Sequence, residues 1–277
     1  MSGINCKSDL ERLEETLVTG IRDYKRTYGF NSLCLGLSGG IDSALVAYLA
    51  VKAAGGENVN CFGMPSRFSS KESVSDAKEL AETLGCRFEV LSIDPLYENF
   101  LSVLEGVFEG LPFNTAEENI QSRIRGTLLM AYSNKFNSML LAAFNKSEMV
   151  MGYCTLYGDM NGALAPIGDI FKTEVYALCR HINNMAEAEG IKPPILPAII
   201  DKPPSAELRP NQKDQDTLPP YEVLDEILKL YLHENLSREE ITGRGWDTEL
   251  VKKIISTVEW AAFKRKQAPP VLLIHRP

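Results

Sequence analysis

Six consecutive residues near the N-terminus combine the groups needed to bind phosphate: Ser38, Gly39, Gly40, Ile41, Asp42 and Ser43. The two glycines allow the backbone to approach an anion closely, and the two serines add hydroxyl donors. A carboxylate is repelled by bare phosphate, so Asp42 suggests a Mg²⁺ ion that bridges the carboxylate and phosphate oxygens. The segment is therefore predicted to hold phosphate together with Mg²⁺.

Two common nucleotide-binding patterns are absent from this sequence. No lysine follows the glycines as the Walker A pattern GxxxxGK[ST] requires, and the dinucleotide pattern GxGxxG does not occur. A kinase or a dehydrogenase is therefore disfavoured. The three histidines, His181, His233 and His275, are too scattered for a zinc site or a serine triad. The chemistry must use other groups.

The anion-binding segment lies between a predicted strand and a predicted helix. Residues 32–37 form an apolar run typical of a buried strand, and residues 41–54 carry an apolar periodicity that ends at two glycines. In open α/β sheets, ligands bind beyond the carboxyl ends of the strands, and the first strand-to-helix turn is the usual anion site. The local pattern thus places the segment where such a site is expected.

Strands and helices alternate along the first half of the chain. Further strands are predicted at residues 59–64, 87–91 and 138–144, and helices at residues 10–28, 70–84, 96–108 and 119–134. This alternation predicts right-handed crossovers. We therefore expect an α/β fold with a doubly wound parallel sheet and helices on both faces.

Two irregular segments interrupt the second half. Residues 155–173 carry three glycines without clear periodicity, which indicates a functional loop or lid, and residues 191–220 hold eight of the chain's fifteen prolines. The proline-rich segment is predicted to wrap the surface or to close over a site. Helices are expected at residues 174–189, 221–234 and 247–267.

The composition limits the class of protein. The 277 residues are 44% apolar and 24% charged, typical of a folded globular chain, and the net charge of −8 does not attract nucleic acid. No apolar run is long enough to span a membrane, and the acidic N-terminus does not resemble a signal peptide, so a cytoplasmic protein is expected. Four cysteines lie in apolar stretches and are predicted to be reduced core residues: Cys34, Cys61, Cys86 and Cys179.

The string SGGIDS resembles the pyrophosphate-binding loop of the N-type ATP pyrophosphatases, whose fold is Rossmann-like and of the adenine nucleotide alpha hydrolase type. Within that superfamily the chain resembles NAD synthetases. The resemblance covers residues 10–270, and its later segments are closer to the synthetase part of glutamine-dependent enzymes than to the short ammonia-dependent ones. It is carried by LGLSGGIDSALVA, MPSRFSSKES, EENIQSRIRGTLLMAYSNK, NKSEMVMGYCTLYGDMNGALAPIGDIFKTEVY, KPPSAELRPNQKDQDTLPPYEVLDEIL and FKRKQAPP.

The resemblance implies a C–N bond-forming ligase that works in two steps. ATP would adenylate the nicotinate carboxylate of deamido-NAD with release of pyrophosphate, and ammonia would then displace AMP to give NAD. Residues 1–277 are predicted to be one synthetase domain without an amidase domain, so the ammonia is either free, which we favour, or supplied by a separate glutaminase subunit. By analogy the chain is expected to form a homodimer.

The resemblance also assigns roles to residues. ATP would be bound by Gly36, Leu37, Ser38, Gly39, Gly40, Ile41, Asp42, Ser43, Met64, Arg67, Lys172 and Ser205. Deamido-NAD would be bound by Asn119, Arg123, Tyr153, Leu156 and Lys264. Asp42 and Glu148 would hold Mg²⁺, and the catalytic residues would be Asp42, Glu148, Asp159 and Lys172.

The sequence departs from the family pattern in front of the predicted metal ligand Glu148. Ala143 and Phe144 replace a threonine, whose hydroxyl contacts ATP in the family, and a glycine. Weaker ATP binding is therefore an expectation, and a nucleotide-binding homologue with reduced or no catalysis is one alternative. Another N-type ATP pyrophosphatase, acting on a purine nucleotide or a transfer RNA, is the second alternative.

Overall fold

The computed structural model describes residues 8–275, whose centre is a sheet of four parallel strands in the order β3-β2-β1-β4. The strands are β1 (Ser32–Gly36), β2 (Val59–Gly63), β3 (Arg87–Val90) and β4 (Ser138–Leu140). Because β2 and β4 flank β1 on opposite sides, the connections change direction at β1. Such a switch point opens a crevice at the carboxyl ends of the strands.

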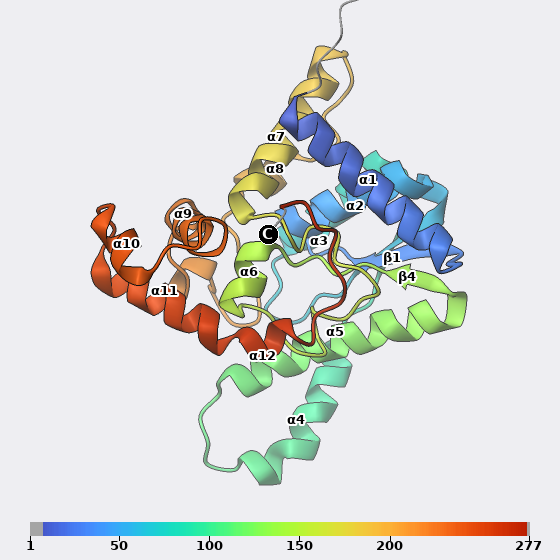
Figure 1. Ribbon diagram of the computed structural model, residues 1–277. Helices are drawn as coiled ribbons and strands as arrows, with labels where there is room; N and C mark the ends of the chain where they lie inside the picture. The colour runs from blue at the N-terminus through green and yellow to red at the C-terminus, as the bar shows by residue number, and fades with distance from the viewer. Residues whose placement is uncertain (1–7, 276–277) are drawn as a thin grey trace, which may run out of the picture.

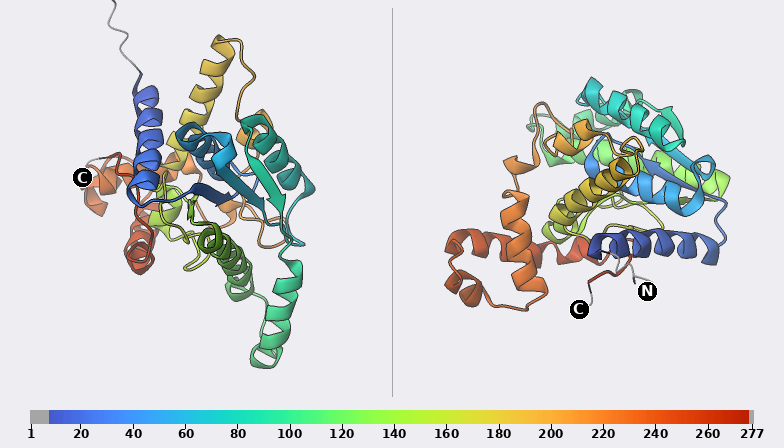
Figure 2. Two further views of the ribbon diagram at one scale, coloured as in Figure 1. Left: turned by 90° about the vertical axis from the view of Figure 1, so that its right-hand side faces the viewer. Right: turned by 90° about the horizontal axis from the view of Figure 1, so that it is seen from above.

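Alternate residues of the strands pack on opposite faces of the sheet. Leu33 and Leu35 of β1 belong to a core with α1 (Asp9–Thr27), α2 (Ile41–Ala54), α3 (Lys71–Leu84) and α7 (Lys172–Ala188). Cys34 belongs to a second core with α4 (Asp94–Phe108) and α5 (Thr115–Phe136) on the other face. The views in Figures 1 and 2 show these two helical layers. The predicted doubly wound α/β fold is confirmed.

A third core lies to one side of the sheet, where the red helices of Figure 1 gather. It joins α6 (Lys146–Met151), α9 (Tyr221–Leu232), α10 (Arg238–Gly243) and α11 (Thr248–Trp260), with α12 (Ala262–Arg265) beyond them. The predicted helix at residues 247–267 is therefore two helices. The sequence analysis missed α10, although Ser237 and Glu240 form the capping box that starts it.

Other elements also differ from the sequence-based expectation, among them α6, which was not predicted. Strand β4 ends at Leu140 rather than at residue 144, because the next residues pair with a returning loop: Ala142 N donates to Leu164 O at 2.9 Å. The proline-rich segment contains the short helix α8 (Pro197–Asp201) and a 3₁₀ turn, η2 (Asp214–Asp216). Residues 155–171 contain no helix within the part of the chain described, as expected for a loop.

The four cysteines predicted to be reduced are free thiols; Cys34, Cys61 and Cys179 are buried, and Cys86 is half-buried. Cys6 and the rest of the first seven residues lie outside the described part of the chain. No helix within residues 8–275 combines the length and the apolar character needed to cross a membrane.

Candidate active site

A cavity of about 600 Å³ lies at the carboxyl ends of β1 and β2. Residues 36 and 37 and the anion-binding segment 38–43 form one wall, and residues of α5, the loop after β4 and the start of α7 form others. The proline-rich segment closes a further side through residues 199, 202–208, 212 and 214. That segment therefore closes over a site, as one of the two sequence-based alternatives proposed.

The anion-binding segment forms a tight turn held by its own serines. Ser38 N donates to Ser43 Oγ at 3.2 Å, and Gly40 N donates to Ser38 Oγ at 3.2 Å. Gly40, which precedes α2, provides no side-chain cap. The N-terminus of α2 thus presents backbone N–H groups and the positive end of the helix dipole to the cavity, which suits an anion.

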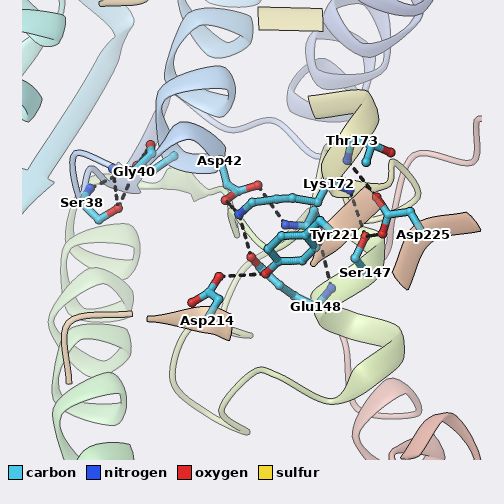
Figure 3. A network of polar contacts seen from close by, with 12 residues as sticks. Ser38, Gly40, Asp42, Ser147, Glu148, Lys172, Thr173, Asp214, Tyr221 and Asp225 are labelled. Atoms are coloured by element: carbon cyan, nitrogen blue, oxygen red, sulfur yellow. Dashed lines mark hydrogen bonds and ion pairs between the residues drawn. The ribbon is translucent and has the colours of Figure 1, made fainter. Parts of the chain in front are cut away.

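A buried ionic cluster lies beside this turn (Figure 3). The Lys172 ammonium contacts Asp42 Oδ2 at 2.5 Å and Glu148 Oε1 at 3.1 Å, and the lysine side chain is only 2% exposed. Burial alone would lower the pKa of Lys172, but the two carboxylates together raise it above its usual value. Lys172 is therefore a permanent cation.

The two carboxylates differ in their surroundings. Burial raises the pKa of Glu148 above its usual value, and Asp42 adds to the rise although Lys172 opposes it. Asn145, a residue that the sequence analysis did not select, donates from Nδ2 to Asp42 Oδ1 at 2.9 Å. Its own Oδ1 accepts from Glu148 N at 3.0 Å and caps α6. One amide therefore links the Asp42 carboxylate to the backbone of Glu148, and the NKSE capping pattern was its only sequence signal.

Asp214 is a further acid that sequence reasoning missed. It is buried, lines the cavity, and accepts a hydrogen bond from the Tyr221 hydroxyl at 2.8 Å. The Tyr221 ring lies beneath Lys172, with Nζ 5.2 Å from its centre. Burial raises the pKa of Asp214, while Lys172 lowers it. Nothing in its sequence context distinguishes Asp214 from the neighbouring Asp216, which is exposed.

Asp159 faces the cavity from the predicted loop. Its Oδ1 accepts from Thr155 N at 2.6 Å, and its own N–H donates to Ser122 Oγ at 3.0 Å. Desolvation by the cavity walls raises the pKa of Asp159 to about 6, although the residue is still exposed to solvent and the Thr155 N–H and the Lys264 charge oppose the rise. Its protonation therefore changes close to neutral pH.

The residues expected to bind deamido-NAD gather around residues 152–156. Thr155 Oγ1 donates to Asn119 at 2.7 Å, and Arg123 Nε donates to Leu156 O at 3.2 Å. Lys264 Nζ donates to the carbonyls of residues 152 and 154, both at 2.7 Å. Tyr153 lines the cavity directly, whereas the other four are not part of its lining.

The remaining predicted ATP residues divide into two groups. Met64 and Ser205 line the cavity. Arg67 does not, because its guanidinium binds Glu98 at 2.6 Å and its backbone N–H binds Asp94 at 2.9 Å on α4.

Two basic residues that the sequence analysis did not select do line the cavity, Arg125 and Lys202. Arg125 Nε donates to Met64 O at 2.9 Å, and Lys202 pairs with Asp76 at 2.5 Å. Burial lowers the pKa of Arg125 to about 10.

The two departures from the family pattern have different settings. Ala143 lines the cavity and is half-buried. Phe144 also reaches the cavity wall, but only 3% of it is exposed, and it packs in an apolar cluster with Met149, Cys154 and Met160. The bulk that Phe144 adds is therefore largely absorbed by the core beneath the loop.

Comparison with known proteins identifies relatives of this chain. Residues 13–268 match the family described as NAD synthase. A glutamine-dependent NAD(+) synthetase of Aquifex aeolicus (strain VF5) is 51% identical over 259 residues, 94% of this chain and 45% of that protein. The chain thus spans about half the length of the curated relatives it matches.

Solved structures of related proteins also cover nearly the whole chain. An NH3-dependent NAD synthetase from Campylobacter jejuni subsp. jejuni NCTC 11168 has 29% identity and a TM-score of 0.73, over 96% of this chain and 100% of that one. An NMN synthetase from Francisella tularensis has 27% identity and a TM-score of 0.78, over 98% and 99%. The chain belongs to the NAD synthase family.

Proposed function

We propose that the chain is an NAD synthetase that adenylates the nicotinate carboxylate of deamido-NAD with ATP and then amidates it with ammonia. The observation that carries this proposal is the buried Lys172 ammonium between Asp42 and Glu148, beside a glycine turn that starts α2. Such an arrangement supplies charge neutralisation and positioning, which nucleotidyl transfer requires more than a protein nucleophile.

In the first step, a nicotinate carboxylate oxygen attacks the α-phosphorus of ATP, and the bond from that phosphorus to pyrophosphate breaks. The N–H groups at the start of α2, with Ser38 and Ser43, bind the phosphates, and Lys172 neutralises the departing negative charge. Two carboxylates that already share one cation are a donor set that fits Mg²⁺. Bound by Asp42 and Glu148, that ion would add positive charge at the phosphate oxygens.

In the second step, ammonia attacks the acyl carbon, the bond to AMP breaks, and the attacking nitrogen loses a proton. Asp159 is the proposed acceptor of that proton, because its carboxyl faces the cavity beside the residues assigned to deamido-NAD. With a pKa of about 6, it is ionised at neutral pH and able to take the proton.

A product assay tests the proposal. The purified chain is given ATP, Mg²⁺ and deamido-NAD with either ammonium or glutamine, and NAD and AMP are separated chromatographically. Equal amounts of NAD and AMP with ammonium alone are expected, whereas product from glutamine alone would contradict the use of free ammonia. Nicotinate mononucleotide serves as a second acceptor because of the likeness to an NMN synthetase. Faster amidation of that acceptor would overturn the assignment of deamido-NAD.

The pH dependence of the second step tests Asp159. We expect the rate per free ammonia to rise about tenfold per pH unit below pH 6 and to level off above pH 7. Asp159→Asn should remove this inflection and lower kcat about 100-fold, whereas Asp23→Asn, an exposed carboxyl on α1, should change neither. An unchanged profile in Asp159→Asn would exclude this role.

The same ionisation affects stability. The pKa of Asp159 is about 6 in the folded chain, whereas an unfolded aspartate has a pKa of about 4. The folded state therefore binds more protons between these values, and stability falls as the pH rises through this window. Asp159→Asn should flatten that part of the curve of melting temperature against pH.

Restoring the family threonine tests where ATP lies. Ala143→Thr should lower the KM for ATP about fivefold, because one added hydrogen bond stabilises binding by about 1 kcal/mol. Ala143→Val has the same shape without the hydroxyl and should give no gain. Equal effects of both changes on ATP titrations would show that the hydroxyl at position 143 does not contact the nucleotide.

We also propose a homodimer, supported by an apolar stripe on α4. Leu96, Phe100, Val103 and Val107 follow a four-three-four spacing on one face of this helix and are 40–80% exposed. The helix projects from the body at the bottom of Figure 1. Two copies of this stripe can bury each other, which makes a second copy of the chain the proposed occupant.

Charge placed in this stripe should separate the subunits. Val103→Glu combined with Val107→Glu is expected to give a monomer by light scattering, with little change in the chain's secondary structure. Ser102→Glu adds charge on another face of α4 and should leave the dimer intact. A double variant that stays dimeric would place the interface elsewhere.

A further inference from the structure

Helix α7, which begins with Lys172, does not cap its own N-terminus with the preceding side chain. The residue before it is Phe171, which has no side-chain acceptor, so the first backbone N–H groups need partners from other elements. Lys172 N donates to Ser147 Oγ at 2.9 Å, and Thr173 N donates to Asp225 Oδ2 at 2.9 Å. The start of α7 is thus capped by α6 and α9.

Asp225 joins these three helices (Figure 3). Its other oxygen, Oδ1, accepts from Ser147 Oγ at 2.5 Å, and the residue is 0% exposed. The hydroxyl of Ser147 therefore links the carboxylate to the Lys172 N–H. Glu148, next in sequence after Ser147, turns towards the lysine ammonium instead.

A buried carboxylate among apolar neighbours destabilises a fold unless its partners compensate. Leu224 and Leu228 on either side of Asp225 are fully buried core residues, and burial raises the pKa of Asp225. The positive end of α7 and the Ser147 hydroxyl offset this penalty. Packing alone does not require a carboxyl group at this position.

Helix α9 supports both the backbone and the ammonium of Lys172. Asp225 holds its backbone through Ser147 and the adjacent N–H, and Tyr221, one turn earlier, supports the ammonium from below. We propose that Asp225 is a positioning residue that holds Lys172, and with it Glu148, at the phosphate site. This role rests on the proposed function, since it concerns the step in which pyrophosphate leaves.

Asp225→Asn tests the proposal with almost no change in volume. An amide oxygen can replace only one of the two acceptors, so the start of α7 should shift. Small misplacements of catalytic groups have large effects on rate, and kcat for NAD formation should fall about 30-fold. The KM for deamido-NAD should stay within about twofold, because the residues assigned to that substrate lie around residues 152–156.

A second variant covers the case in which Asp225→Asn does not fold. Ser147→Ala removes the hydroxyl that links Asp225 to Lys172 N, and it should lower kcat about tenfold. If both variants fold, the double variant should lose no more than the worse single variant, because both act on one network. Additive losses would show that Ser147 and Asp225 act separately and would contradict the proposal.

Two controls on the same helix separate positioning from stability. Glu226→Gln makes the same chemical change at an exposed site and should keep wild-type kcat. Leu228→Ala removes a buried core side chain and should lower the melting temperature while keeping kcat for the folded fraction. An Asp225→Asn enzyme with kcat within twofold of wild type, or no lower than that of Leu228→Ala, would overturn the proposal.

ATP binding tests the positioning role of Asp225 independently of the proposed function. A wild-type chain that forms no NAD would contradict that function, while calorimetric titration with ATP and Mg²⁺ would still report on Lys172. Asp225→Asn should then weaken ATP binding about tenfold relative to Glu226→Gln. Equal affinities would reject the positioning role on their own.

Discussion

Lys172→Met is expected to lower kcat/KM for NAD formation about 1,000-fold and to destabilise the fold. The substitution keeps most of the side-chain volume but removes the only cation that contacts both Asp42 and Glu148 among the ion pairs of residues 8–275. Removing one partner of a buried ion pair leaves an uncompensated buried charge, a change that typically costs about 3–5 kcal/mol. The charge that faces the departing pyrophosphate is lost as well.

Steady-state kinetics and thermal unfolding measure the two effects of Lys172→Met separately. Mg²⁺ should raise the melting temperature of the variant more than that of the wild type, because a divalent ion can replace the missing positive charge. Lys146→Met is the matched control, since Lys146 is also largely buried and pairs with Asp169 at 2.7 Å, but does not line the cavity. It should lose stability and keep kcat/KM within about threefold. A Lys172→Met enzyme with a tenth of wild-type activity would contradict the proposed role.

Gly39→Ala is expected to abolish ATP binding and to lower the melting temperature. Gly39 has a φ of 79°, and a Cβ at this position would lie 2.3 Å from the backbone oxygen of Ser73. The left-handed backbone costs about 1–2 kcal/mol for a residue with a Cβ, and the clash forces α2 and α3 apart. We expect the affinity for ATP to fall at least about 100-fold.

Gly40→Ala is the matched control for this prediction. Gly40 has a φ of −94°, and its added Cβ would meet only the Ser38 hydroxyl oxygen, at 3.3 Å. Its melting temperature should stay close to that of wild type, and ATP affinity measured by calorimetry should fall less than about tenfold. Similar melting temperatures for the two variants would show that Gly39 is not held against Ser73.

Local signals in the sequence were enough to predict the anion-binding turn and most of the fold. A buried strand, two glycines and a helix with short-range periodicity place residues 38–43 at the start of α2, because each of these features depends on neighbours in the chain. Alternating strands and helices then leave few topologies for a parallel sheet. Where a boundary differed, as for β4, pairing with a distant segment decided it.

The residues of the candidate site could be predicted only in part from local sequence signals. Asp42, Glu148 and Lys172 were selected from the sequence, and the structure brings them into one cluster. Arg67 was selected too, but in the structure it pairs with Glu98 and does not line the cavity. A basic residue after a strand has the same local sequence signal whether it faces the ligand or a neighbouring helix.

The sequence by itself determined the family resemblance, the anion-binding turn and the residue types of the charged cluster, because these are encoded in short contiguous motifs. Only the tertiary structure revealed Asn145, Asp214 and Asp225 as partners of that cluster. Aspartate at an exposed turn and aspartate in a core look alike in sequence. Burial and hydrogen bonding, which give these side chains their effect, arise when helices distant in the chain pack together.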